Sequence, residues 1–151
     1  MSQTVLITGA SNGIGKACAR VFARKGYDLV LVARHREKLE AVKAELSEYD
    51  VQIKVIAMDL TGEDAAVDLY NDLVLDDISI DILVNNAGFG DHGAFHDSSW
   101  EKQKKMVLLN IVALMQMTYV FGQAMKRRKK GRILNVASIA GLCAGPYMST
   151  Y

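Results

Sequence analysis

The sequence predicts an α/β fold in which a doubly wound sheet of parallel strands carries helices on both faces. Three observations lead to this prediction. Short apolar, β-branched runs alternate with amphipathic stretches of helical spacing along the chain. A glycine-rich turn follows the first apolar run. A single proline among 151 residues leaves the regular elements uninterrupted, and this length fits one domain or part of one.

The first half of the chain gives two strand–helix pairs. Residues 5–8 are apolar and β-branched, as in a buried strand, and residues 14–25 place their apolar side chains on one helical face. Gly26 follows two basic residues and is a typical helix stop. Residues 29–32 predict a second buried strand, and the charged, amphipathic stretch 36–49 predicts a second helix.

The second half repeats the alternation. Residues 51–56, 80–84 and 132–136 have the apolar character of strands, and residues 61–76 have helical spacing. Ser98 and Glu101 match a capping box at the start of a long helix that reaches about Lys129. Strict strand–helix alternation favours parallel strands, because each crossover helix returns the chain to the same edge of the sheet.

Composition excludes several classes of protein. Eighteen Lys and Arg residues against 17 Asp and Glu give a net charge of +1, so an anionic polymer is not demanded as a partner. Cys18 and Cys143 form neither a disulfide framework nor a zinc set, and the three histidines lack paired ligand spacing, so no metal site is predicted. We expect a reduced, cytoplasmic setting, and the N-terminus shows no signal-peptide pattern.

One segment of the long helix resembles a membrane span. Residues 106–125 are mostly apolar and lie between two groups of lysines. Asn110, Gln116 and Gln123 within it would be costly in lipid. A helix covered by the sheet on one side and by another subunit on the other explains the same pattern. We therefore expect no membrane span, and a homodimer or homotetramer formed through the 99–129 helix.

The basic run at residues 126–130 has two interpretations. It could indicate a nucleic-acid contact. It also fits a cationic helix C-terminus that complements the helix dipole. We prefer the second interpretation and expect no nucleic-acid partner.

The turn after the first strand reads T-G-A-S-N-G-I-G. Gly9 permits a sharp turn, Gly13 lets the backbone approach a phosphate, and Gly15 lets the helix pack closely on the strand. Free N–H groups at the helix start would face a pyrophosphate. The alternative is an ordinary strand–helix turn with spare glycines. The predicted cofactor contacts of this loop are Thr8, Gly9, Ser11, Asn12, Gly13, Ile14 and Gly15.

The G-x-x-x-G-x-G spacing after Thr8 resembles the short-chain dehydrogenase/reductase family, and the resemblance follows the whole chain. It implies a Rossmann-like fold whose single dinucleotide-binding domain, residues 1–151, lacks its C-terminal part. Asn85-Asn86-Ala87-Gly88 looks like the family's N-N-A-G motif beside the cofactor, and Asp59, followed by Leu60, sits where the family holds the adenine edge. The resemblance further implies three catalytic residues, which are Asn110, Ser138 and Tyr151.

The residues after the second strand bear on cofactor choice. An NAD-selective site of this kind places an acid there for the ribose hydroxyls. This sequence has no carboxylate at that place and has Arg34 and Arg36 instead. A guanidinium suits a 2′-phosphate, and Ser11 could add a hydroxyl donor. We therefore expect NADP(H), with solvated helix-surface charges as the alternative reading of the two arginines.

The resemblance implies a chemistry for the predicted site. Hydride transfer to a carbonyl needs a proton donor, and the family uses a tyrosine whose pKa is lowered by a lysine four residues later. Ser138 would hydrogen-bond the substrate oxygen, and Asn110 would keep a water path to the lysine. The sequence ends at Tyr151, before that lysine, and we expect it to belong to a longer chain.

These residues leave two functions open. The first is an NADP(H)-dependent oxidoreductase acting on a ketone or secondary alcohol. The alternative is a non-catalytic NADP(H)-binding regulator of the same fold.

Overall fold

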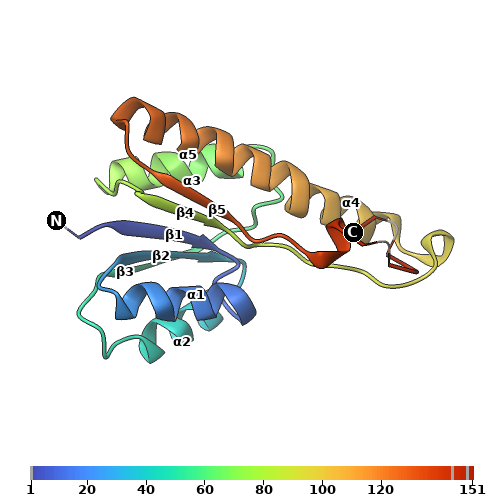
Figure 1. Ribbon diagram of the computed structural model, residues 1–151, viewed down its shortest axis with the longest axis horizontal. Coiled ribbons are helices and arrows are strands. Elements are labelled where there is room, and N and C mark those ends of the chain that lie inside the picture. The colour runs from blue at the N-terminus through green and yellow to red at the C-terminus, as the bar shows by residue number, and fades with distance from the viewer. Residues whose placement is uncertain (1, 144, 149) are drawn as a thin grey trace.

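The computed structural model describes residues 2–143, 145–148 and 150–151, and it contains one five-stranded parallel sheet. Its strands lie in the order β3-β2-β1-β4-β5, and every neighbouring pair is parallel (Figure 1). The predicted α/β fold is therefore confirmed. The strands are β1 (Thr4–Thr8), β2 (Asp28–Ala33), β3 (Ile53–Ala57), β4 (Ile82–Asn85) and β5 (Arg132–Asn135).

Helices cover both faces of this sheet, as expected for a doubly wound fold (Figure 1). Helices α1 (Gly13–Arg24) and α2 (Arg36–Glu45) lie on one face, and α3 (Ala65–Leu75) lies on the other beside the long helix. The long helix consists of α4, a six-residue π-helical segment and α5. Their bounds are Trp100–Val107, Leu108–Ala113 and Leu114–Arg128.

Two apolar layers hold the helices to the sheet, because alternate side chains of each strand point to opposite faces. On β1, Val5 and Ile7 pack with α1 and α2, whereas Leu6 packs with α3 and α5. All three are 0% exposed. Phe121 on α5 is 2% exposed and forms an edge-to-face pair with Tyr70 on α3. The central strands therefore form a fixed platform for the loops at their ends.

The structure corrects several sequence-based boundaries. The helix expected over 36–49 ends at Glu45, and the helix expected from residue 61 begins at Ala65. The capping box is wrong, because the long helix begins at Trp100 after Ser99 and neither cap bond forms. The Ser98 hydroxyl instead donates to the Phe95 carbonyl oxygen, at 2.7 Å, in the short 3₁₀ turn Phe95–Asp97. Local turn chemistry competes with helix capping at this position.

The long helix Trp100–Arg128 is long and apolar enough to cross a membrane, with a mean hydropathy of 1.4 over its most apolar window. One of its faces is packed in the core, where Met117, Phe121 and Met125 are buried. Core helices of soluble proteins pass the same length and composition test, so the test alone is weak evidence of a membrane span. A second face stays open, and its exposed apolar side chains are Ile111, Val112, Met115 and Tyr119.

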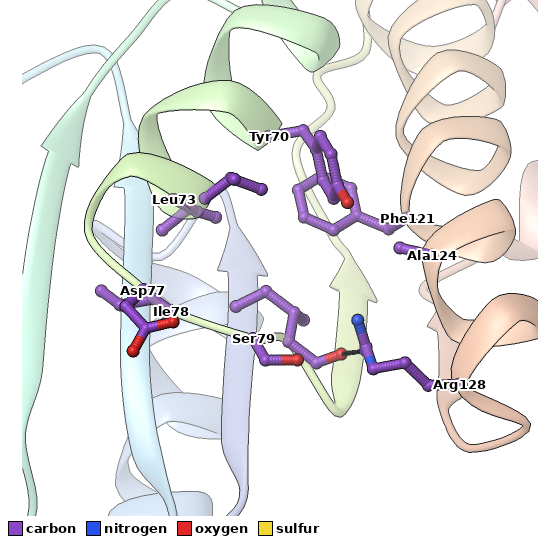
Figure 2. A pocket seen from close by; sticks show the side chains of 10 residues that line it. Tyr70, Leu73, Asp77, Ile78, Ser79, Phe121, Ala124 and Arg128 are labelled. Carbon is purple, nitrogen blue, oxygen red and sulfur yellow. Dashed lines mark hydrogen bonds between the residues drawn. The ribbon is translucent and has the colours of Figure 1, made fainter.

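The basic end of α5 is used at the amino edge of the sheet, away from the glycine-rich turn. A small cavity of about 150 Å³ lies there between α3 and α5. Figure 2 shows the side chains that line it. Arg128 donates to the Ile80 carbonyl oxygen at 2.6 Å, and Lys130 pairs with Asp81 at 2.9 Å. Arg127 donates to the Tyr70 hydroxyl at 3.3 Å. These contacts support the structural interpretation of the cationic run.

Candidate active site

Each of the five strands is followed at its carboxyl end by a predicted site residue. The glycine-rich turn follows β1, Arg34 follows β2, Asp59 follows β3, Asn86 follows β4, and Ser138 follows β5. β1 and β4 are neighbours in the sheet although β2 and β3 come between them in the chain. This is the point where the strand order reverses, and doubly wound folds bind ligands in the crevice there.

Each of the three glycines in the turn is required for a different physical reason. Gly9 has a φ of +65°, and a Cβ there would lie 2.9 Å from Ala87 Cα. A Cβ on Gly15 would overlap the Gly9 carbonyl oxygen. Gly13 has a φ of +51°, and nothing lies within 4 Å of where its Cβ would be. Gly9 and Gly15 therefore allow close packing, whereas Gly13 leaves bare backbone open at the start of α1.

This turn fits a bound pyrophosphate. α1 begins at Gly13, and the side chain of its N-cap residue, Asn12, accepts no backbone hydrogen bond. The first N–H groups of the helix are thus left for an anionic ligand. Ile14, on the same first turn, is 60% exposed. The open Gly13 backbone gives a phosphate room to approach these donors.

Thr8 and Asn86 join the turn to the loop after β4 rather than pointing outward. The Thr8 Oγ1 accepts hydrogen bonds from the backbone N–H groups of Asn86, at 2.9 Å, and Ala87, at 3.0 Å. It donates to the Val84 carbonyl oxygen at 3.3 Å. Asn86 Nδ2 donates to the carbonyl oxygens of Thr8, at 2.9 Å, and Gly9, at 3.2 Å. Both side chains were predicted as cofactor contacts, and in the structure they fix the glycine-rich turn against the loop after β4.

Arg34 and Asp59 lie at the rim of the same edge, and both are exposed. Within the described residues, Arg34 forms no ion pair. Asp59 accepts hydrogen bonds from the Thr61 N–H, at 3.0 Å, and hydroxyl, at 2.9 Å. These bonds, with a smaller contribution from the Arg34 charge, hold the pKa of the Asp59 carboxyl below its ordinary value. Leu60 is only 6% exposed and packs in the core, so its side chain faces away from the edge.

Asn110 lies in the π-helical segment, where sequence reasoning expected an unbroken α-helix. Its Oδ1 accepts from the Phe89 N–H at 3.1 Å, and its Nδ2 donates to the Phe89 carbonyl oxygen at 2.9 Å. A Cβ on Gly88 would lie 3.0 Å from the same Oδ1. Asn110 therefore clamps the backbone of the loop after β4. π-Helical turns of this kind are frequent at functional sites.

Ser138 and Tyr151 approach the edge from the segment after β5. Ser138 Oγ accepts a hydrogen bond from the Ala140 N–H at 3.2 Å, and this leaves the hydroxyl hydrogen available to donate. The Tyr151 ring packs over Gly90, where an added Cβ would lie 3.4 Å from Tyr151 Cδ2. In the part of the chain that the structure describes, no hydrogen bond joins Asn110, Ser138 and Tyr151 directly. Their predicted catalytic roles stay predictions.

A buried amide network beneath the site was not identified from the sequence. Asn85 is 4% exposed, and its Nδ2 donates to Thr118 Oγ1 at 3.0 Å and to Asn135 Oδ1 at 2.9 Å. Asn85 and Asn135 are register partners at the ends of β4 and β5. The network ties the ends of β4 and β5 to Thr118 on α5. Asn135, at the end of β5, lies three residues before Ser138. Its one sequence signal was an asparagine at the end of each of two strands.

Comparisons with known proteins agree with this architecture. The family model described as short chain dehydrogenase matches residues 3–151. A very-long-chain 3-oxoacyl-CoA reductase of Coccidioides immitis is 35% identical over 97% of this chain and 43% of its own length. A short-chain dehydrogenase from Sphingobium yanoikuyae in complex with NADPH is 37% identical, with a TM-score of 0.90 over 99% of this chain and 59% of that one.

A solved structure of NAD⁺-bound xylitol dehydrogenase is also similar. It is 31% identical, with a TM-score of 0.91 over 99% of this chain and 58% of that one. The chain therefore spans less than half the length of the C. immitis reductase and about three fifths of the two structures. The family model covers the glycine-rich turn, the loop after β4, and Ser138 through Tyr151. The chain belongs to the short-chain dehydrogenase family.

Proposed function

We propose that the protein is an NADP(H)-dependent oxidoreductase that interconverts a ketone and a secondary alcohol. One observation carries the proposal. At a single edge of the sheet, the glycine-rich turn, whose Gly13 backbone is open, contacts the loop after β4 through Gly9, and the Tyr151 ring packs over Gly90 of that loop. The first feature suits a phosphate-bearing cofactor, and the second suits a proton donor for a carbonyl oxygen.

The chain's own groups would divide the work. When bound, NADP(H) supplies or accepts the hydride. The Ser138 hydroxyl, whose oxygen already accepts from the Ala140 N–H, would donate to the substrate oxygen and orient it. The Tyr151 phenol would give that oxygen its proton in reduction and take it back in oxidation. Asn110 would hold the Phe89 backbone and so the position of the next residue, Gly90, on which the Tyr151 ring packs.

We propose NADP(H) over NAD(H) because of the residues after β2. Arg34 is exposed there and has no ion-pair partner in the described part of the chain, so its guanidinium is available to a 2′-phosphate. Arg36 instead pairs with Glu40 at 3.7 Å along α2. The NADPH complex of the S. yanoikuyae relative supports this preference, whereas the NAD⁺ complex of xylitol dehydrogenase shows that similar chains take either cofactor.

The substrate class rests on the proton chemistry and on the relatives. The name of the C. immitis reductase specifies a 3-oxoacyl thioester, and the 3-oxo group is a ketone. We propose the broader class, ketones and secondary alcohols, for this chain. The exposed apolar residues near the site, Ile139 and Leu142, are compatible with an apolar substrate.

The test is turnover by the full chain with Tyr151→Phe as the variant. Wild type should oxidise NADPH with members of a ketone panel that includes a 3-oxoacyl thioester. Tyr151→Phe should lose at least about a hundredfold in kcat, in line with the removal of a general acid, and keep its NADPH affinity. Wild type that binds NADPH tightly but turns over no member of the panel would favour the regulatory alternative.

We also propose that a second copy of the chain covers the long helix. Its open face carries a stripe of Ile111, Met115 and Tyr119, which are 50%, 63% and 68% exposed. These residues recur every four positions, so they share one face opposite the buried Met117 and Phe121. Homo-oligomers bury such faces by two-fold symmetry, which gives a dimer or a tetramer.

A further inference from the structure

The loop between β4 and α4 is fastened to α4 at one acidic residue, Asp91. Its carboxylate forms an ion pair with Lys102 and accepts a hydrogen bond from Gln103 Nε2 at 3.1 Å. Gln103 is 6% exposed and the Asp91 side chain is 16% exposed, so the hydrogen bond between them is enclosed, whereas the Lys102 side chain is 52% exposed and closes the attachment from the solvent side. The Lys102 ammonium, with a smaller contribution from the His92 N–H, lowers the pKa of the Asp91 carboxyl.

The residues on either side of Asp91 contact the segment that ends in Tyr151. Gly90, on one side, supports the Tyr151 ring. On the other side, the Gly93 N–H donates to the Tyr147 carbonyl oxygen at 3.0 Å. The His92 ring also packs on the Tyr147 ring, with centroids 5.5 Å apart. Figure 1 shows this loop and the C-terminal segment together beside α4.

Among the described residues, the hydrogen bonds and ring contacts that Tyr147 makes outside its own segment are those with Gly93 and His92. Tyr147 has a φ of +61°, a left-handed conformation that is unfavourable for a non-glycine residue and persists only where neighbours impose it. Tyr147 is 62% exposed, so in the described part of the chain it is restrained by the contacts with His92 and Gly93 rather than by burial. A loop that shifts would therefore release Tyr147 and the support under Tyr151 together.

We propose that Asp91 is a positioning residue, which holds Tyr151 over the site by anchoring the β4–α4 loop to Lys102 and Gln103. The carboxylate acts through Gly90 and Gly93 and need not touch substrate or cofactor. The inference rests on the proposed function in one respect only, the role of Tyr151 in turnover. The anchor itself is a property of the folded chain and can be measured without catalysis.

The experiment compares three variants of the full chain. Asp91→Ala removes the anchor, and Lys102→Met removes the ion pair but leaves the hydrogen bond to Gln103. Asp97→Asn is the matched control, because Asp97 lies in the same loop, is 75% exposed and only approaches His96, at 3.6 Å. Each is measured for kcat with a ketone, for the KM for NADPH, and for hydrogen exchange of the Gly93 amide.

Asp91→Ala should lower kcat about tenfold, because displacements on the order of 1 Å at a reacting group can cost up to about a hundredfold. The KM for NADPH should change less than about twofold, since the glycine-rich turn keeps its own contacts, and Gly93 should exchange at least about tenfold faster. Lys102→Met should show the same pattern more weakly, and Asp97→Asn should match wild type. If Asp91→Ala does not fold, Lys102→Met carries the test.

Several outcomes would overturn the inference. An unchanged kcat, losses equal to those of Asp97→Asn, or a KM for NADPH that rises as much as kcat falls would each do so. Wild type without turnover would instead count against the proposed function. Gly93 exchange then decides the anchor alone: faster exchange in Asp91→Ala supports it, and unchanged exchange contradicts it.

Discussion

The carboxyl edge of the sheet is built in two different ways. Around β1 and β4 the strands are buried, and backbone groups of adjacent loops bind one another through Thr8 and Asn86. β5 is exposed at all four of its residues, and the segments that follow it reach the edge through a few side-chain contacts. Both regions supply residues to the proposed site, but only the first is held by packing on every side.

Because of this difference, we expect the region around β1 and β4 to determine cofactor affinity and the region after β5 to determine the rate of the reaction. The glycine-rich turn is preorganised by close backbone contacts, so changes there should affect stability and the affinity for the proposed cofactor. Ser138 and Tyr151 are held by fewer contacts, namely the Asn85–Asn135 hydrogen bond and the loop anchored by Asp91. Changes in those supports should affect rate before they affect binding.

The largest expected effect is at the tightest contact in the packed region. Gly15→Ala would place a methyl group into the Gly9 carbonyl oxygen and 2.5 Å from Asn86 Nδ2. Neither neighbour can move freely, because both take part in the loop's hydrogen bonds. We expect a loss of about 3 kcal/mol in the free energy of unfolding, measured by urea denaturation of the full chain.

Gly13→Ala is the matched control for that change. It has open space around the new methyl group, so only its positive φ opposes the substitution, at a cost of about 1–2 kcal/mol. NADPH affinity should fall more than it does for changes outside the turn, because the methyl group would meet the approaching phosphate. Equal destabilisation by the two substitutions would contradict the distinction between packing and approach.

The next largest effect is on cofactor choice at the rim of the packed region. Arg34→Ala should weaken NADPH binding by about 1.5–3 kcal/mol, the range for hydrogen bonds to charged groups, and leave NADH binding nearly unchanged. Fluorescence titration of both cofactors measures this. Arg36→Ala removes only the ion pair with Glu40, so it should leave the affinities for NADPH and NADH unchanged. Equal losses for the two cofactors after Arg34→Ala would refute the proposed 2′-phosphate contact.

The packed region was also the more predictable from sequence. The apolar runs of β1, β2 and β4 indicate strands that are buried on both faces. The spacing of the glycines reflects backbone requirements within one turn. Boundaries failed where side chains form local turns, as at Ser98 and at Asp59, whose carboxylate binds Thr61 ahead of α3. Those hydrogen bonds compete with helix starts in ways that hydrophobic periodicity does not record.

The less packed region was harder to predict because its contacts are long-range. The Asn85–Asn135 bond depends on strand register across 50 positions, and Thr118 meets it from a helix. The π-helical turn at Asn110 leaves the apolar pattern of the helix unchanged, so no periodicity indicates it. Asp91 carries no motif, and its importance appears only when its two partners on α4 are seen.

A smaller effect is expected at the open face of the long helix. Met115→Glu should weaken self-association of the full chain by about tenfold or more, because a buried methionine contributes roughly 1.5–3 kcal/mol. Sedimentation without detergent measures the change. Val67→Glu is the control, since Val67 is also apolar and 44% exposed but lies on α3. A wild-type protein that is monomeric at micromolar concentration would contradict the proposal that a second copy covers the long helix.

The smallest effect concerns the attachment of β5 and depends on pH. Burial tends to raise the pKa of the Asp81 carboxyl, but the Lys130 ammonium and the Thr4 N–H outweigh it, so the pKa lies below its ordinary value of 3.8. Stabilisation by Asp81 is therefore complete above that value and is lost as the pH falls through the lower native pKa. Asp81→Asn should cost about 0.5–1 kcal/mol at pH 7 and progressively less below about pH 4 in urea denaturation. The Asp76 side chain is 48% exposed, against 17% for Asp81, so Asp76→Asn, which removes the ion pair with Lys54, should cost less at pH 7. A cost for Asp81→Asn that stays constant or grows toward low pH would show that the charge of Asp81 does not hold β5 at the edge of the sheet.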